Sequence, residues 1–377
     1  MSLITYLNKI HFADEVLEEA LSAETEALSI NRPLVVTDSA IAGTGLVERI
    51  YDALKPNRDV IVFTDTPCNP TEAACRSAAE LYKHSECDGV IAFGGGSSID
   101  LAKAAGLLAT HEGGLASYAA IEGGVERIKN IMPPLIAVPT TAGSGSEVGR
   151  AAVIVLDDGR KLGLISPYLI PQVAICDPTL TLDLPPALTA GTGMDAISHC
   201  VETYVATAYN PPADGIALDG LSRAAANIEL AVEHGQDIDA RREMMAAAMN
   251  GALATQKGLG GVHAMSHALG SVAGPEIHHG TLNAILLPHV LQFNAPAVGD
   301  RYVAIKQAMK LPAQADLPNA IDKLRAKLNL PSRLSDLGID ENTVERAAPL
   351  AEKDHTNRTN PRRAKAADYK EIMASAL

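Results

Sequence analysis

Short apolar runs alternate with amphipathic stretches through the first 180 residues of the chain. The runs have the length and β-branched content of buried strands, and they lie at 33–38, 60–63, 89–93, 135–138 and 173–176. Apolar residues at helical spacing predict helices at 14–28, 47–54 and 71–83 and from about residue 98 onward. This alternation predicts a parallel, Rossmann-like sheet with helices on both faces, beside a hairpin at 153–165.

From residue 186 onward the pattern is helical almost throughout, and strand signals fade. The predicted helices include 187–207, 213–233, 239–256, 259–271 and 281–293. Asp177-Pro178 and Pro185-Pro186 interrupt the chain where the pattern changes. We therefore predict an α/β domain at residues 1–180 and an all-α domain at residues 181–377.

The composition argues against several kinds of partner and location. Of 377 residues, 47% are hydrophobic but only 3% aromatic, so the cores must consist of Ala, Leu, Ile and Val. The net charge of −14, without a Lys/Arg run, argues against nucleic acid and anionic membranes as partners. No stretch approaches the roughly 20 apolar residues that cross a bilayer. The five cysteines form no Cys-x-x-Cys pair and the N-terminus lacks a signal-peptide layout, which predicts a cytoplasmic protein.

Two glycine-containing turns follow strands of the predicted sheet. The segment 94–100, Gly-Gly-Gly-Ser-Ser-Ile-Asp, lies between a strand and a helix, where backbone N–H groups can hold a phosphate. The segment 139–147 adds hydroxyls and glycines behind a second strand. Either turn alone could be an ordinary connection, but two at strand ends of one parallel sheet favour a nucleotide site. Asp38 could bind ribose hydroxyls and repel a 2′-phosphate, which favours NAD over NADP, or could simply cap a helix.

Acidic and histidine side chains recur at helical spacing in the second half. Asp195 and His199 are four residues apart on one predicted helix, and His263 and His267 on another. One such pair is most simply a hydrogen bond between neighbours on a helix. Two pairs together with a later His-His-Gly at 278–280 favour a metal site, because zinc and iron(II) take three or four nitrogen and oxygen ligands. With no cysteine among the candidates, both metals stay open.

Over essentially its whole length the chain resembles the iron-containing (group III) alcohol dehydrogenases. The matching motifs are the segments 94–100 and 139–147, Gly193-Met194-Asp195-Ala196 with His199, the His263/His267 helix and His279-Gly280-Thr281-Leu282-Asn283-Ala284. The resemblance implies the fold of that family, which is similar to that of dehydroquinate synthase. It also implies an NAD-linked, metal-dependent enzyme that oxidises an alcohol or reduces the corresponding aldehyde.

Carried over by motif position, the resemblance implies four metal ligands, which are Asp195, His199, His263 and His279. His267 would then lie beside the nicotinamide, as a candidate for proton relay. The doubled histidine leaves open whether His278 contributes to the metal site. Iron(II) is the metal that the resemblance implies, with zinc as the alternative.

The same motifs assign the cofactor site. The residues expected to bind NAD are Asp38, Gly94, Gly95, Gly96, Ser97, Ser98, Asp100, Thr140, Thr141, Ser144 and Lys161. The glycine turn would hold the pyrophosphate, the two threonines would lie by the adenine or ribose, and Asp38 would set the preference for NAD.

Within the family the chain most resembles the 4-hydroxybutyrate dehydrogenases, through residues 121–124, 147–150, 156–163 and 210–220. This implies interconversion of 4-hydroxybutyrate and succinate semialdehyde. The substrate carboxylate needs a cation, and Arg150 is our candidate because it follows the second turn and can form a bidentate pair. A surface arginine or a salt bridge is the plain alternative for Arg150. Weaker candidates for the same role are Lys161, His355 and Arg358.

Other functions stay open from the sequence. The substrate could be another small primary alcohol, diol or aldehyde. Sugar cyclases and polyol dehydrogenases have a similar two-domain shape, but they are expected to carry different ligand motifs. A non-enzymatic metal- or nucleotide-binding protein is the remaining alternative, although unpaired buried imidazoles would destabilise it. Because members of the family commonly associate, we expect a homo-oligomer, either a dimer or larger.

Overall fold

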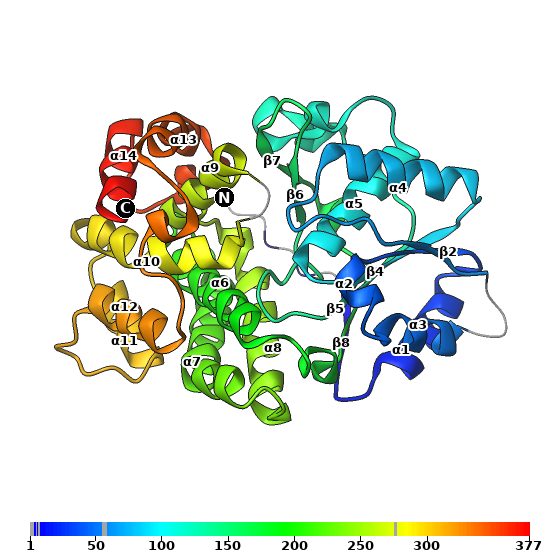
Figure 1. Cartoon of the computed structure of the whole chain (residues 1–377), viewed down its shortest axis with the longest axis horizontal. Coiled ribbons are helices and arrows are strands. Elements are labelled where there is room, and N and C mark those ends of the chain that lie inside the picture. Colours follow the sequence, from blue (N-terminus) through cyan, green and yellow to red (C-terminus); the bar gives the residue numbers. More distant parts are fainter. Residues whose placement is uncertain (1–3, 5, 7, 55–58, 275–276) are drawn as a thin grey trace. The chain divides into compact units, whose positions relative to one another are not determined.

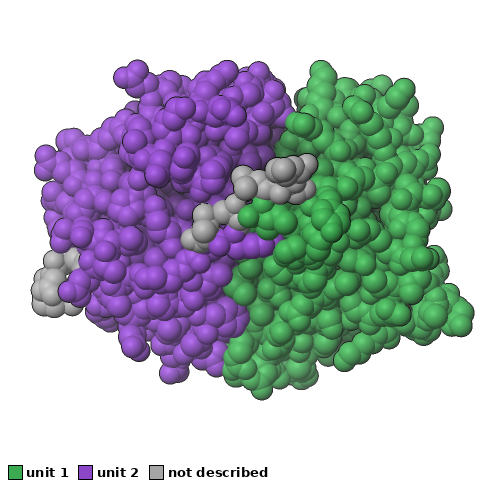
Figure 2. All heavy atoms as spheres, turned by 180° about the vertical axis from the view of Figure 1, so that it is seen from behind, with its two compact units in different colours: residues 1–5, 142–145, 182–377 green, residues 6–141, 146–181 purple. Residues whose placement is uncertain are grey.

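The computed structural model describes residues 4, 6, 8–54, 59–274 and 277–377. They form two compact units, which are coloured separately in Figure 2. Unit 2 comprises Tyr6–Thr141 and Ser146–Thr181, and most of unit 1 is Leu182–Leu377. Ala142–Gly145, from the middle of the second glycine-containing turn, also belongs to unit 1.

A six-stranded parallel sheet forms the centre of unit 2 (Figure 1). Its strands, in spatial order, are β1 (Lys9–Phe12), β8 (Val173–Cys176), β5 (Leu135–Pro139), β4 (Gly89–Gly94), β2 (Pro33–Val36) and β3 (Ile61–Phe63). Strand β3 lies on one side of β2, and β4, β5 and β8 follow on the other side, as in doubly wound folds. A separate antiparallel hairpin consists of β6 (Ala151–Val155) and β7 (Lys161–Ile165). The predicted parallel sheet is therefore confirmed.

Each face of the sheet has its own helices because successive strand residues point to opposite faces. The helices are α1 (Leu17–Ala27), α3 (Leu46–Leu54), α4 (Glu72–His84) and α5 (Gly96–Thr110). Val35 and Ile91 pack in the hydrophobic cluster that includes residues of α1 and α3. Their neighbours Leu34 and Val90 pack in the cluster that includes residues of α4 and α5.

Unit 1 is helical, as the sequence predicts, and none of its described residues belongs to a β-strand. Its α-helices are α6 (Pro186–Val205), α7 (Pro211–Glu233), α8 (Ile238–Ala254), α9 (Gly261–Ala273), α10 (His279–Asn294), α11 (Arg301–Ala308), α12 (Leu317–Lys327), α13 (Glu341–Lys353) and α14 (Ala366–Ser375). Small residues let these helices pack closely, as where Gly220 lies against Cys200 and Asn250. Across the described parts of the chain, no helix combines the length and the apolar character needed to span a membrane.

Some short elements were not predicted from the sequence. Strand β1 mixes polar and apolar residues, and among the described strands it pairs with β8 alone, at the edge of the sheet. The four-residue helix α2 (Ser39–Ala42) depends on a side-chain cap at Asp38. Short 3₁₀ turns also occupy much of 115–127. A single helix cap or a single neighbouring strand specifies such elements, and the spacing of hydrophobic residues in the sequence does not reveal either one.

The interior of unit 2 contains a fully buried lysine on α5. Lys103 Nζ donates to the carbonyl and hydroxyl oxygens of Ser146 at 2.7 and 2.8 Å, and to the carbonyls of Gly149 and Ala151 at 2.9 and 2.8 Å. Asp100, nearly one turn earlier, accepts from Ser146 Oγ at 2.6 Å and from the Val153 N–H at 2.8 Å. These contacts hold α5 to the segment that leads into the hairpin.

Candidate metal centre and cofactor site

Three helices of unit 1 bring an aspartate and two histidines together. Asp195 on α6 has its Oδ1 3.7 Å from Nε2 of His263, on α9, and 3.9 Å from Nε2 of His279, on α10. One ligand atom from each of these residues lies within 4.8 Å of the other two. Ligands about 2.1 Å from a tetrahedral ion are about 3.4 Å apart. The cluster is therefore only slightly wider than a metal site requires.

Two glycines allow the close approach of α10 to α6. A Cβ atom on Gly280 would lie 2.1 Å from the Gly191 carbonyl oxygen and 3.2 Å from Asp195 Cβ. No side chain at position 280 can avoid that overlap without moving α10 away from α6. The glycine directly after His279 is therefore what lets this imidazole reach Asp195.

His278 occupies a different position from His279. It precedes the first residue of α10, and its Nδ1 lies 3.1 Å from Thr281 Oγ1. A Cβ atom on Gly191 would lie 2.7 Å from the His278 ring. Among the described residues, His278 is not part of the Asp195–His263–His279 cluster.

His199 lies beside this cluster rather than within it. Its Nδ1 is 3.8 Å from Asp195 Oδ1, and its ring stacks on His263 with centroids 4.5 Å apart. The ring is hydrogen-bonded to the Gly143 backbone, whereas Nδ1 is buried and has no hydrogen-bond partner among the described residues. Burial lowers the pKa of His199 to about 4, so the ring is neutral at pH 7 and can offer a lone pair to a metal. Because an unpaired buried nitrogen is unfavourable, these residues fit the divalent metal that the motif implies.

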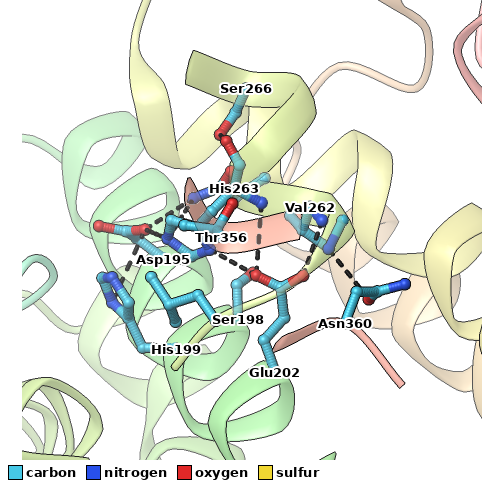
Figure 3. A network of polar contacts seen from close by, with 12 residues as sticks. Asp195, Ser198, His199, Glu202, Val262, His263, Ser266, Thr356 and Asn360 are labelled. Carbon is cyan, nitrogen blue, oxygen red and sulfur yellow. Dashed lines mark hydrogen bonds and ion pairs between the residues drawn. The ribbon is translucent and has the colours of Figure 1, made fainter. Parts of the chain in front are cut away.

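Glu202 is a site residue that we did not predict from the sequence (Figure 3). This buried carboxylate on α6 accepts from Nδ1 of His263 at 2.6 Å and from the Val262 N–H at 2.7 Å. It thereby caps the start of α9 and leaves Nε2 of His263 to face Asp195. The sequence did hold one indication of this role, because Glu202 follows Asp195 by seven residues and so lies on the same face of the helix.

Replacing Glu202 by glutamine is expected to weaken metal binding by ~10–100-fold, because the neutral amide orients His263 less strongly than the carboxylate does. Competition with a chromophoric chelator measures the affinity. The matched control is Glu24→Gln in unit 2, which removes a buried carboxylate paired with Lys9 and His11. Equal metal affinity in both variants and the wild type would contradict the orienting role.

His267 pairs with a distant carboxylate. Its Nδ1 lies 3.0 Å from Asp354 Oδ2, and its ring stacks on His279 and His355 with centroids 5.4 and 6.0 Å apart. Asp354 also caps a short 3₁₀ turn through the Thr356 N–H, at 2.8 Å. Helical spacing alone had paired His267 with His263. The structure places these two rings edge to face, with centroids 5.9 Å apart, and also joins His267 to a residue 87 positions later.

The glycine turn lies at the carboxyl end of β4, beside the end of β2, where nucleotides bind in doubly wound sheets. At Gly94, where φ is +152°, a Cβ atom would lie 2.6 Å from Ser98 Oγ. Helix α5 starts at Gly96 without a side-chain cap, which leaves its first N–H groups available to a phosphate. Asp38 Oδ1 caps α2 through the Ile41 N–H at 2.9 Å, and its Oδ2 lies 3.5 Å from Ser98 Oγ. Asp38 therefore does cap a helix, and its second carboxylate oxygen lies toward the glycine turn.

The threonines of the second turn lie next to the glycine turn within unit 2. The Thr140 N–H donates to the Gly94 carbonyl at 3.0 Å, and Thr140 Oγ1 is buried without a hydrogen-bond partner among the described residues. A Cβ atom on Gly95 would lie 3.3 Å from the Thr141 side chain. Ser97 Oγ donates to the Cys68 carbonyl. The two turns therefore form one surface at the carboxyl ends of β4 and β5.

Ser144 lies in the short segment that belongs to unit 1. The glycines beside it meet helices closely, since a Cβ atom on Gly145 would lie 2.2 Å from Ala252 Cβ and one on Gly143 would lie 2.7 Å from Thr192 Cβ. Helix packing therefore explains these two glycines without a ligand.

Two cationic residues of unit 2 were also predicted to bind ligands, Lys161 to bind NAD and Arg150 to bind the substrate carboxylate. Lys161 Nζ donates to Asn69 Oδ1 at 2.7 Å. Arg150 is exposed, and no described residue forms an ion pair with its guanidinium. The salt-bridge alternative for Arg150 is not realised among the described residues.

Comparison with known proteins places the chain in a family. Residues 8–178 match the iron-containing alcohol dehydrogenase family, and residues 189–377 match the C-terminal domain of the same family. The chain is 51% identical to the 4-hydroxybutyrate dehydrogenase of Cupriavidus necator, and the match covers 100% of each chain.

Solved structures agree. A 1,3-propanediol oxidoreductase matches with a TM-score of 0.92 and 32% identity over 100% of both chains. A sulfoacetaldehyde reductase from Bifidobacterium kashiwanohense, solved in complex with NAD⁺, matches with a TM-score of 0.89 and 27% identity, over 100% of this chain and 98% of the other. The chain therefore belongs to the iron-containing alcohol dehydrogenase family.

Proposed function

We propose that this alcohol dehydrogenase interconverts 4-hydroxybutyrate and succinate semialdehyde, with NAD as the hydride acceptor in the oxidative direction. The observation that carries the proposal is the 51% identity, over the full length of both chains, to a 4-hydroxybutyrate dehydrogenase. A second candidate is a small diol. It is favoured by the 36% identity to the 1,3-propanediol dehydrogenase of Citrobacter freundii, over 92% of this chain and 91% of the other.

In this proposal Asp195, His199, His263 and His279 hold the metal. Three imidazoles and one carboxylate suit both iron(II) and zinc, and the family favours iron(II). A divalent metal held there supplies Lewis acidity, which lowers the pKa of an alcohol hydroxyl. Glu202 keeps His263 oriented through the 2.6 Å contact at Nδ1.

His267 is the residue that we assign to proton movement or to shaping the nicotinamide pocket. The Asp354 carboxylate lies 3.0 Å from Nδ1 of His267. The anionic partner favours a proton on Nδ1, which directs the other ring nitrogen to accept a proton. The stack on His279 places this ring next to the proposed ligands.

We assign NAD binding to the first domain, residues 1–180, and metal binding to the second, residues 181–377. The uncapped start of the 15-residue helix α5 supports a pyrophosphate site at 94–98. The Asp38 oxygen that faces Ser98 supports NAD over NADP, because a carboxylate repels a 2′-phosphate. The Asp100 carboxylate is occupied by Ser146 and Val153, so we assign it to positioning this turn. The remaining proposed NAD contacts are Gly95, Gly96, Ser97, Thr140, Thr141, Ser144 and Lys161.

Arg150 is our candidate for the substrate carboxylate. Arg150 is an exposed residue, although burial around its guanidinium lowers the pKa of that group. It has no ion-pair partner among the described residues, whereas Arg160, nearby in sequence, binds Glu122 and Asp158. A planar guanidinium without an internal partner is suited to a bidentate contact with an external carboxylate.

Replacing Arg150 by methionine is expected to lower kcat/KM for 4-hydroxybutyrate by ~10–100-fold, the equivalent of one lost charged hydrogen-bonding pair. The value for 1-butanol, which has the same chain length without the carboxylate, should stay unchanged. NADH absorbance measures both reactions, and Arg160→Met is the matched control. An equal loss for both alcohols, or no loss for either, would contradict the assignment.

The setting of the enzyme is also part of the proposal. We infer a cytoplasmic homo-oligomer, either a dimer or larger. All five cysteines are free thiols, four of them buried, which suits a reducing compartment. The net charge of −14 supports a small-molecule substrate rather than a polyanionic partner.

A further inference from the structure

An asparagine lies at the centre of the metal cluster. Asn283 follows His279 by one turn of α10 and is fully buried. Its Nδ2 lies 2.8 Å from Asp195 Oδ1, 3.2 Å from His279 Nε2 and 3.4 Å from His263 Nε2. The amide nitrogen therefore contacts three of the four proposed metal ligands.

The hydrogen bonds of this amide are unevenly satisfied. Its NH₂ group has two hydrogens, and of its three contacts the one with the Asp195 carboxylate is the shortest. Its Oδ1 is buried and has no hydrogen-bond partner among the described residues. Because a buried unpaired carbonyl opposes folding, stability alone does not explain an amide at this position. The reason for an asparagine at position 283 therefore lies in its contacts with Asp195, His263 and His279.

We propose that Asn283 positions Asp195 for the metal and thereby sets the affinity of the site. A carboxylate oxygen has two lone pairs, so Asp195 Oδ1 can keep the N–H bond from Asn283 while its other lone pair faces an ion. The two longer contacts, to the imidazole nitrogens, are those that an ion would replace. The inference depends on the ligand set proposed above.

Two substitutions of Asn283 should change metal binding in opposite directions. Asn283→Ala removes the bond that orients the carboxylate, and we expect Zn²⁺ affinity to fall by ~10–100-fold. Asn283→Asp also removes this N–H bond, but it places a second carboxylate beside Asp195. The two charges repel in the metal-free protein and a cation relieves the repulsion, so Zn²⁺ affinity should rise.

The test measures Zn²⁺ affinity by chelator competition, and the melting temperature with and without Zn²⁺, for the wild type and both variants. The matched control is Asn250→Ala, which removes another 2.8 Å asparagine–aspartate bond of unit 1, to Asp219. The Zn²⁺-induced rise in melting temperature should be smaller than in the wild type for Asn283→Ala, larger for Asn283→Asp and unchanged for Asn250→Ala.

Two results would overturn the inference while leaving the ligand set in place. One is wild-type affinity in both Asn283 variants. The other is tighter binding by Asn283→Ala, because the amide would then compete with the metal. If Asn283→Ala does not fold, Asn283→Leu takes its place, because leucine keeps the size of the side chain but has no N–H group; wild-type affinity in that variant overturns the inference. A wild-type protein that binds no metal would overturn the proposed ligand set and this inference together.

Discussion

Asp195→Ala is expected to abolish metal uptake and to lower alcohol dehydrogenase activity by at least ~10³-fold. Asp195 supplies the only carboxylate of the proposed ligand set, and its Oδ1 lies within 3.9 Å of nitrogen atoms from three histidines. Its loss also leaves the Asn283 amide without its shortest contact. Metal content by mass spectrometry and NADH formation measure the two effects.

Asp219→Ala is the matched control for Asp195→Ala. Asp219 lies on α7, where it pairs with Arg223 and is half exposed. This variant should keep wild-type metal content and activity. If Asp195→Ala retained one metal per chain and wild-type turnover, the proposed centre would be in the wrong place.

The second large effect is expected from Lys103→Met, which should lower the free energy of unfolding by about 3–5 kcal/mol. The substitution leaves the carbonyls of Ser146, Gly149 and Ala151 without their buried donor. It also removes the nearby cation from the buried Asp100 carboxylate. Urea denaturation measures the change. Lys129→Met, on an exposed lysine, is the control and should change stability by less than about 0.5 kcal/mol.

The effect of Lys103→Met on stability should also depend on pH. Burial lowers the pKa of Lys103 to about 8, below its ordinary value of 10.5. Between these two values the unfolded chain binds the proton and the folded chain does not, so this group makes stability rise with pH. The stability difference between wild type and Lys103→Met should therefore grow from pH 8 to about 10.5. A difference that stays constant would contradict the buried position of the ammonium group.

Local patterns were sufficient for most of the fold. Strand residues such as Val35 and Leu34 alternate between the two faces, and this period of two comes directly from the backbone. Helical spacing likewise located the helices that carry Asp195 and His263. Strand β1 was missed because only its pairing with β8 defines it.

The partners within the site could not be predicted from spacing. The two i,i+4 pairs look alike in sequence, yet His263 faces Asp195 and His267 binds Asp354. Glu202 reaches His263 across 61 residues, and Lys103 reaches carbonyls of another segment. Such long-range contacts arise only when helices pack. The assignment of all four ligands came from the family motifs, and it stays a prediction.

The most direct test of a metal-dependent 4-hydroxybutyrate dehydrogenase is NADH formation by the metal-stripped protein as iron(II) is returned without oxygen. With 4-hydroxybutyrate and NAD, the stripped protein should be inactive, and activity should rise until about one iron per chain is bound. Full activity in the stripped protein, or none with 4-hydroxybutyrate after one iron per chain is bound, would contradict the proposed function.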